Sequence, residues 1–176
     1  MKKRVILSFA ALAAVLFAAA PAHAQQTRNA AVTVNGGNAV GLLLHVTDNV
    51  ALRPEFSFTR SAIEQTTGST TNDSSSWQLG AGGSALFYVG DDNGLRMYLS
   101  PRFILSRAKS STSSNGAQNA YNTSGSVGAQ YGLGERFAIF GELGLNYAWQ
   151  KTSSTLSTVK SSSFGTRSSV GVAIYF

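Results

Sequence analysis

Five charged side chains stand in this sequence where ion pairing is the expected chemistry. Each lies in a segment whose apolar and polar residues alternate, and each falls on the less apolar side; they are Arg53, Glu55, Arg96, Arg102 and Glu142. Such alternation is typical of β-strands with one buried face. If these sides line one enclosed interior, each charge needs an opposite partner there, because an unpaired buried charge is costly. The sequence therefore predicts an internal Glu–Arg network, with Glu55, Arg102 and Glu142 at one level and Arg53 and Arg96 nearer one end.

His45 is the one histidine outside the N-terminal leader described below, and a histidine can serve as a general base. Ser57 and Glu55 could be its neighbours in an enclosed interior. The sequence nevertheless supplies no recognisable arrangement of nucleophile, base and orienting group. It has no cysteine and no cluster of metal-ligand residues. We expect no enzymatic activity, no cofactor and no metal, with His45 filling space as a hydrogen-bonded side chain.

The elements that would position these residues are β-strands. The clearest alternation covers 136–150, where Phe137, Ile139, Leu143 and Leu145 share one face and small or polar residues occupy most of the other. Alternation recurs in 39–46, 50–60, 75–89, 95–107, 121–133 and 168–176. A short eighth strand over 28–34 would pair across the link 35–38. We predict an all-β fold of eight antiparallel strands.

Pro54 and Pro101 occupy matching places inside two of these segments. Proline has no N–H to donate to a neighbouring strand, so within sheets it is normally confined to edges and bulges. We therefore predict a local β-bulge at each of the two prolines.

The first 24 residues have the pattern of an export signal. Lys2, Lys3 and Arg4 precede an apolar run over 5–20, and Ala-His-Ala at 22–24 gives the small-x-small pattern of a signal-peptidase site. A single membrane-spanning anchor is the alternative, although the run is short for one. Cleavage leaves 25–176 as one domain. Three of the 14 basic residues lie in the leader, so the other 11 against eight acidic residues give +3, too little to indicate a nucleic-acid partner.

Beyond the leader, no apolar stretch approaches the roughly 20 residues of a transmembrane helix, so a chain that crosses a membrane here must form a closed barrel. The predicted connections alternate in length. Those at 47–49, 90–94 and 132–135 are short, whereas those at 61–74, 108–120 and 151–163 are long and rich in Ser and Thr. Short periplasmic turns opposite long outer loops are the arrangement of outer-membrane barrels.

This orientation sorts the exposed side chains. Basic residues would face outward, where they suit the phosphates of lipopolysaccharide; the predicted contacts are Arg60, Arg107, Lys109 and Lys151, with Lys160 and Arg167 nearby. Aromatic residues would form girdles at the two bilayer boundaries. The outer girdle would contain Trp77, Tyr121, Tyr147 and Trp149, and the inner one Phe87, Tyr88, Phe137 and Phe176.

The last predicted strand carries apolar residues at every second place and ends on an aromatic one, as Val170, Val172, Ile174 and Phe176. With the leader and the alternating connections, this ending resembles the small eight-stranded outer-membrane barrels of the OmpA/OmpX type. The resemblance covers about residues 28–176. It implies an up-and-down transmembrane barrel in a Gram-negative-type outer membrane, expected as a monomer. It also implies that these four residues are read by the barrel-assembly machinery.

A barrel of this class does not by itself define an activity. Eight strands enclose a lumen that side chains can just fill, so we expect the charge network to plug it. The role would then be in envelope structure, or in surface recognition and adhesion through the three long loops. A narrow passive pore for small solutes is the alternative. A lipid A-modifying enzyme and a soluble periplasmic β-protein are further alternatives.

Overall fold

The computed structural model describes residues 29–36, 39–67, 70–110, 117–153 and 158–176. The predicted signal peptide, residues 1–24, lies outside the described residues. Eight strands make up the described chain: β1 (Ala30–Asn35), β2 (Ala39–Thr47), β3 (Val50–Thr67), β4 (Thr70–Asp92), β5 (Leu95–Ser110), β6 (Ala117–Gly132), β7 (Phe137–Ser153) and β8 (Thr158–Tyr175). Within these ranges no helix is long and apolar enough to cross a bilayer.

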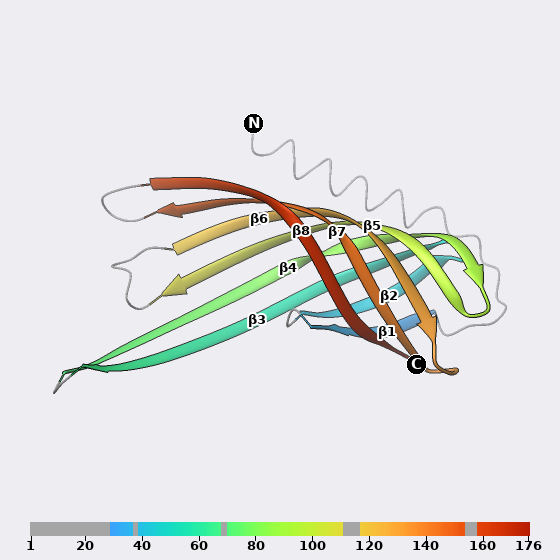
Figure 1. Ribbon diagram of the computed structural model, residues 1–176, viewed down its shortest axis with the longest axis horizontal. Coiled ribbons are helices and arrows are strands. Elements are labelled where there is room, and N and C mark those ends of the chain that lie inside the picture. The colour runs from blue at the N-terminus through green and yellow to red at the C-terminus, as the bar shows by residue number, and fades with distance from the viewer. Residues whose placement is uncertain (1–28, 37–38, 68–69, 111–116, 154–157) are drawn as a thin grey trace.

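The strands form one closed barrel in which each strand pairs antiparallel with its neighbours in the sequence (Figure 1). β1 closes the ring by pairing with β8, from Ala31 opposite Tyr175 to Asn35 opposite Gly171. The N–H of Phe176 also donates to the carbonyl of Ala30 at 3.2 Å. The predicted fold of eight antiparallel strands is confirmed. β1 begins at Ala30 and ends at Asn35, where a first strand was predicted over 28–34; residue 28 lies outside the described residues.

Alternating side chains explain why these segments close into a barrel. On β7, Ala138, Phe140 and Glu142 are buried, whereas Phe137 and Ile139 are exposed. Successive side chains of a strand point to opposite faces of the sheet. One face of each strand therefore encloses the lumen, and the other face forms the outer wall.

Three tight turns, at 48–49, 93–94 and 133–136, lie at one end of the barrel, which we call the turn end (Figure 1). Asn93 and Gly94 connect β4 to β5 with φ angles of 49° and 84°. A two-residue hairpin turn of type I′ requires positive φ at both positions, and Asn-Gly adopts it readily. This turn is shorter than the predicted link 90–94, because β4 continues to Asp92.

The opposite end, which we call the loop end, is more regular than predicted. The expected loops 61–74, 108–120 and 151–163 are largely strand. β3 and β4 pair up to Thr67 opposite Thr70, and β7 and β8 pair up to Ser153 opposite Thr158. The β3–β4 hairpin extends farthest (Figure 1). The loop prediction was wrong there because Ser and Thr side chains suit both solvated faces of a strand ladder, and Thr favours strands.

The predicted bulges at Pro54 and Pro101 are absent. Pro54 stays in register with Gly83 on β4, and Pro101 with Gly125 on β6. On its other side Pro54 faces β2 and Pro101 faces β4. In both ladders the paired positions are interrupted at the proline, and the same register resumes beyond the interruption. The prediction was wrong because the missing N–H affects only the neighbour toward which it would point. The register shifts in these two ladders lie near the turn end, at His45/Thr47 and at Tyr88/Gly90.

The barrel wall is low at β1 and β2. These strands have six and nine residues, whereas the other six have 16 to 23. The β2–β3 pairing stops at Ala39 opposite Ser57, and the β1–β8 pairing at Asn35 opposite Gly171. From these points toward the loop end, β3 and β8 run apart (Figure 1), and no ladder joins them within the described ranges.

Candidate functional site: the lumen network and the outer wall

A buried carboxylate on β3 is surrounded by donors from three strands. The Oε2 atom of Glu55 accepts from Arg102 on β5, at 2.8 Å from Nη2 and 3.0 Å from Nε. Its Oε1 atom accepts from Nε of Arg102 at 3.1 Å, the hydroxyl of Ser84 at 3.2 Å and Nε of Arg53 at 3.3 Å. These charge-assisted hydrogen bonds offset the desolvation of the buried carboxylate.

A second buried carboxylate, Glu142 on β7, continues the network across the lumen. Its Oε1 atom accepts from Nη2 of Arg53 at 2.6 Å and from the hydroxyl of Tyr98 at 3.2 Å. Its Oε2 atom accepts from Nη1 of Arg167 at 2.7 Å. Arg167 also donates to the hydroxyl of Ser126 at 3.2 Å. Side chains of β3, β5, β7 and β8 are thus tied together inside the barrel.

Arg53 joins the two halves of this network. Its side chain is 2% exposed, bonds both carboxylates and lies 5.3 Å from the centre of the Phe140 ring. Three guanidinium groups, of Arg53, Arg102 and Arg167, therefore face two carboxylates. The network carries one excess positive charge.

The structure brings together four of the five predicted network residues: Arg53, Glu55, Arg102 and Glu142. Arg96 lies elsewhere, at the turn end, where its guanidinium stacks 3.9 Å from the Tyr88 ring centre and pairs with Asp91 at 3.4 Å. The prediction that Arg96 belongs to the network was wrong, because Arg96 lies too near the β4–β5 turn to reach Glu55 or Glu142.

Arg167 was predicted to face outward, and it points into the lumen instead. The predicted loop ended at 163 and the predicted last strand began at 168, so Arg167 was left outside the strand and its side chain was not assigned to the lumen face. β8 begins ten residues earlier, at Thr158. Extending the alternation of Ser169 and Gly171 back by one step would have placed Arg167 on the lumen side.

Aromatic side chains fill the lumen on the turn-end side of the charges. Tyr98 is fully buried, and its ring meets the Tyr88 ring edge-on at a centroid distance of 5.5 Å. Gly128 makes room for it, since a Cβ at that position would overlap the Tyr98 ring. The Tyr88 hydroxyl donates to Gln130, which donates to the hydroxyl of Tyr175. This layer is packed and hydrogen-bonded across β4, β5, β6 and β8.

His45 is half-buried in the same region. Its ring stacks on Tyr88 and Tyr175, at centroid distances of 5.5 and 6.1 Å. The predicted neighbours Ser57 and Glu55 lie farther along β3, since the register places His45 opposite Ala51. In the ranges that the structure describes, no group of three or more His, Cys, Asp or Glu side chains could hold a metal ion.

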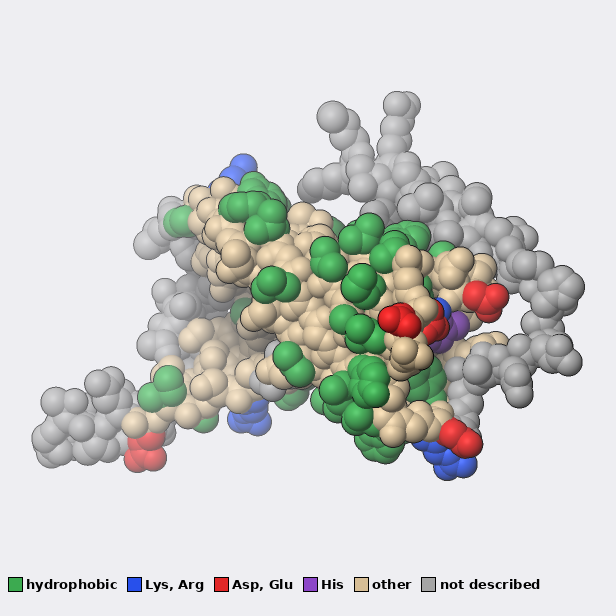
Figure 2. Space-filling view, turned by 45° about the vertical axis from the view of Figure 1, so that its right-hand side comes forward, with side chains coloured by type: hydrophobic (Ala, Val, Ile, Leu, Met, Phe, Trp, Pro, Cys, Tyr) green, Lys and Arg blue, Asp and Glu red, His purple; other side chains and the backbone are tan. Residues whose placement is uncertain are grey.

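The large apolar side chains of the barrel point mainly outward. Phe56, Leu99, Val127, Leu143 and Val170 are exposed, with exposed fractions between 48% and 72%. Figure 2 shows hydrophobic side chains spread over the outer wall. With charges inside and apolar groups outside, the distribution is that of a barrel whose outer face contacts lipid.

Seven of the eight predicted girdle residues lie on the outer wall: Trp77, Phe87, Tyr121, Phe137, Tyr147, Trp149 and Phe176. Tyr121 and Trp149 are in contact, with ring centroids 5.2 Å apart. Tyr88 was placed in the inner girdle and is instead 7% exposed in the lumen. That assignment was wrong because Tyr88 follows Phe87 directly, so the two side chains take opposite faces.

The predicted basic contacts lie beside these aromatic residues. Arg60, Arg107 and Lys109 are exposed, and Lys151 is half-buried. The register places Trp77 between Arg60 and Lys109. Lys151 lies opposite Asn119 on β6, which in turn lies opposite Arg107 on β5. The four basic residues therefore form an outer row toward the loop end, on β3, β5 and β7.

Comparison with known proteins identifies the architecture. No protein-family model matches the sequence, and no curated protein matches it. A major outer-membrane protein of Thermus thermophilus has a TM-score of 0.51 at 12% identity, with 84% of this chain and 98% of that one covered. Neisserial surface protein A has a TM-score of 0.48 at 16% identity, with 84% and 92% covered. The chain has the outer-membrane β-barrel fold. At these identities the likeness shows the fold alone.

Proposed function

We propose that the protein is an integral outer-membrane barrel with a closed lumen, which acts in envelope structure or in surface recognition at its loop end. The observation that carries the closed lumen is the network of Arg53, Glu55, Arg102, Glu142 and Arg167. Breaking one pair would leave a buried charge without its partner. An open water-filled path through this layer would require several such pairs to separate at once.

A non-catalytic role is part of this proposal. The ring of His45 stacks on Tyr88 and Tyr175, and its register partner Ala51 offers no hydroxyl that it could activate. The loop end offers a more suitable surface for binding a partner, because the β3–β4 hairpin projects beyond the rest of the barrel (Figure 1).

Conductance in planar bilayers tests the closed lumen. The purified wild-type barrel is expected to show no steady conductance. The double variant Arg53→Ala/Glu142→Ala removes both bridging side chains while keeping the charge balance, and it is expected to conduct. Arg96→Ala/Asp91→Ala, which removes a pair at the turn end, is the matched control and should stay closed. A sizeable steady conductance of the wild type would favour the narrow pore and overturn the closed lumen.

The membrane location has a separate test. The exposed apolar wall requires lipid or detergent to remain soluble. The protein is expected in the outer-membrane fraction and to migrate differently on a denaturing gel before and after boiling. Recovery in the soluble periplasmic fraction would support the soluble β-protein instead.

We also propose that lipopolysaccharide binds to the basic row on the outer wall. Arg60, Arg107, Lys109 and Lys151 lie next to aromatic residues that suit a bilayer boundary, and guanidinium and ammonium groups bind phosphate well. The triple variant Arg60→Ala/Arg107→Ala/Lys151→Ala is expected to retain less lipopolysaccharide during purification. Arg136→Ala at the turn end is the control. Unchanged retention would contradict the contact.

Assembly by the barrel-assembly machinery as a monomer completes the proposal. Val170, Ile174 and Phe176 are exposed on the outer face of β8, and Val172 is half-buried there. Replacing Phe176 by Ala is expected to slow insertion in cells without altering the barrel once it is folded. Equal insertion rates would argue against recognition of this residue.

A further inference from the structure

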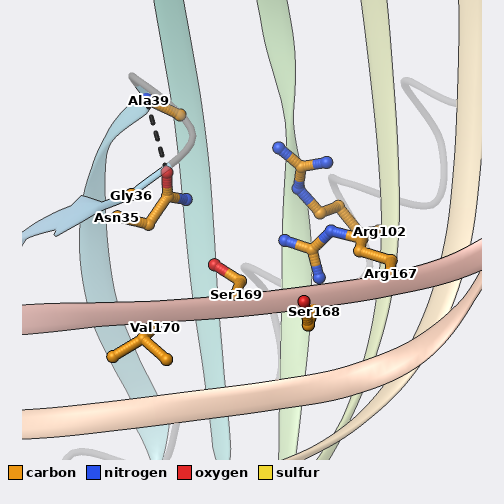
Figure 3. A pocket seen from close by; sticks show the side chains of 8 residues that line it. All are labelled: Asn35, Gly36, Ala39, Arg102, Arg167, Ser168, Ser169 and Val170. Atoms are coloured by element: carbon orange, nitrogen blue, oxygen red, sulfur yellow. Dashed lines mark hydrogen bonds between the residues drawn. The ribbon is translucent and has the colours of Figure 1, made fainter.

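A pocket of about 440 Å³ lies where the barrel wall is low. It is lined by Asn35, Gly36 and Ala39 of the β1–β2 hairpin, by Arg102 of β5, and by Arg167, Ser168, Ser169 and Val170 of β8. Figure 3 shows the two guanidinium groups directed into the same space, with the hairpin residues across from them. Since Val170 is exposed on the outer wall and Arg102 is in the lumen, the pocket reaches from the interior to the edge of the gap between β3 and β8.

The pocket is electrically positive. Arg102 bonds Glu55 through Nε and Nη2, and Arg167 bonds Glu142 through Nη1. Their remaining terminal nitrogens make no hydrogen bond to another described residue, and the two side chains are 14% and 15% exposed. The network behind them has one guanidinium more than it has carboxylates. An anion in the pocket would balance this charge.

Buried polar atoms without partners lie beside the arginines. Ser124, 7% exposed and directly opposite Arg102 on β6, has a buried hydroxyl with no hydrogen-bond partner among the described residues. The same holds for the side-chain oxygens of Asn122 and Asn146, and Asn146 lies opposite Ser124. Buried polar atoms usually have a partner, and a hydrated or hydroxyl-bearing ligand would supply one. Charge and unused hydrogen-bonding groups thus point to the same part of the lumen.

We propose that this pocket binds a phosphate group. Two arginines with free N–H groups match the several oxygens of a phosphate, and the hydroxyl of Ser169, which lines the pocket, can donate a further hydrogen bond. This site differs from the outer basic row, because Arg102 and Arg167 face inward.

The low wall provides a route for a lipid phosphate, which rests on the proposed membrane location. Phe164 on β8 is 70% exposed and lies opposite Tyr147, one of the outer aromatic residues. It stands six residues beyond Val170 toward the loop end. The gap between β3 and β8 therefore begins on the turn-end side of Phe164 and Tyr147. If these aromatic residues mark the outer bilayer boundary, the gap lies at the depth of the outer leaflet. A lipid headgroup could enter there with its chains left in the bilayer, whereas free phosphate would enter from the loop end.

Calorimetric titration of the folded full-length mature barrel in detergent tests the proposal, with inorganic phosphate and 1-oleoyl lysophosphatidate as the two probes. The wild type is expected to bind at least one of them. Arg167→Gln and Ser169→Trp should each weaken binding about tenfold or more. The second variant fills the pocket without removing a charged group. Arg136→Gln, which removes an equal charge at the turn end, outside both the pocket and the basic row, should bind like the wild type.

The two probes separate the sources. Tenfold tighter binding of lysophosphatidate supports entry of a lipid through the gap, and equal affinities support free phosphate. Absence of binding of either probe to wild-type protein that still shows heat-modifiable migration would overturn the site. Binding that both Arg167→Gln and Ser169→Trp leave unchanged would overturn it as well. A conducting wild type would overturn the closed lumen alone, since phosphate binding could still be measured.

Discussion

The two halves of the lumen are filled by different kinds of side chain. On the turn-end side, Leu43, Leu86 and Tyr98 are each at most 1% exposed and belong to one packed cluster. On the loop-end side, Arg102 and Arg167 border a pocket, and the hydroxyl of Ser124 is buried without a partner among the described residues. The turn-end half is thus filled by packed side chains, whereas the loop-end half contains charged groups and a hydroxyl that has no hydrogen-bond partner among the described residues.

Glu142 lies at the boundary between these halves. It accepts from Tyr98 on the turn-end side and from Arg167 on the loop-end side. The comparison teaches that the same lumen is filled by close contact at one level and crossed by ion pairs at the next. The two mechanisms respond differently to substitution, because packing depends on volume and ion pairing on charge.

The largest effect is expected from Glu142→Ala. Removal of this carboxylate leaves Arg53 without one of its two partners and Arg167 without its carboxylate, in a buried setting. The free energy of unfolding should fall by about 3–5 kcal/mol, as measured by urea unfolding in lipid vesicles. Glu64→Ala, at an exposed position on β3, is the control and should change little. A loss below about 1 kcal/mol for Glu142→Ala would show that the network does not hold the barrel closed.

Overpacking the turn-end half should have the next largest effect. In Gly128→Val the new Cβ would overlap the Tyr98 ring. A destabilisation of about 1–3 kcal/mol is expected from the same unfolding measurement. Gly125→Val on the same strand is the matched control, since nothing lies within 4 Å of a Cβ there. Equal effects of the two variants would mean that the Tyr98 layer is not tightly packed.

Tyr98→Phe keeps the ring and removes the hydroxyl that donates to Glu142. Because the acceptor is charged, the loss should be about 1.5 kcal/mol, with the larger part of the packing retained. Tyr88→Phe, which removes a hydrogen bond to the neutral Gln130, should cost less. A larger loss of stability for Tyr88→Phe than for Tyr98→Phe would show that the Tyr98 hydroxyl does not stabilise the charge network.

The smallest change in stability is expected from alanine substitutions at two serines of equal burial. Ser84 accepts from Arg53 and donates to Glu55, whereas the hydroxyl of Ser124 has no partner among the described residues. Ser84→Ala is expected to destabilise by about 1 kcal/mol, and Ser124→Ala to be nearly neutral. Thermal midpoints of the folded band on gels would resolve the pair. A larger loss at Ser124 would show that its hydroxyl is already bonded in the folded protein.

Alternation along the chain was enough to predict the strands and the inward direction of four network residues. It succeeded because a strand places successive side chains on opposite faces, so Glu55 and Glu142 could be assigned without knowledge of their partners. Arg167 was missed because the predicted strand began one residue after it. Ser and Thr gave no signal that β8 extends farther, since they are common both in loops and in solvated strands.

The pocket could not be predicted from the sequence. It depends on the length of β1 relative to β3 and β8, and on the level at which Asn35 meets Gly171. Register between strands far apart in the chain is a property of the closed barrel. The pairing of Pro54 and Pro101 could not be predicted for the same reason. Only the observed ladder shows toward which neighbouring strand the missing N–H of each proline would have pointed.

The seam between β1 and β8 has a consequence for the order in which the barrel forms. It joins segments from opposite parts of the chain through five paired positions, whereas β3 and β4 are neighbours in sequence and share 18. Pairing of distant segments carries a larger loop-closure entropy and forms more slowly than a local hairpin. The ring should therefore be completed at this seam after the hairpins are in place. Amide protons of β1 should also exchange with solvent before those of the β3–β4 ladder, which makes the seam the first part of the wall to open.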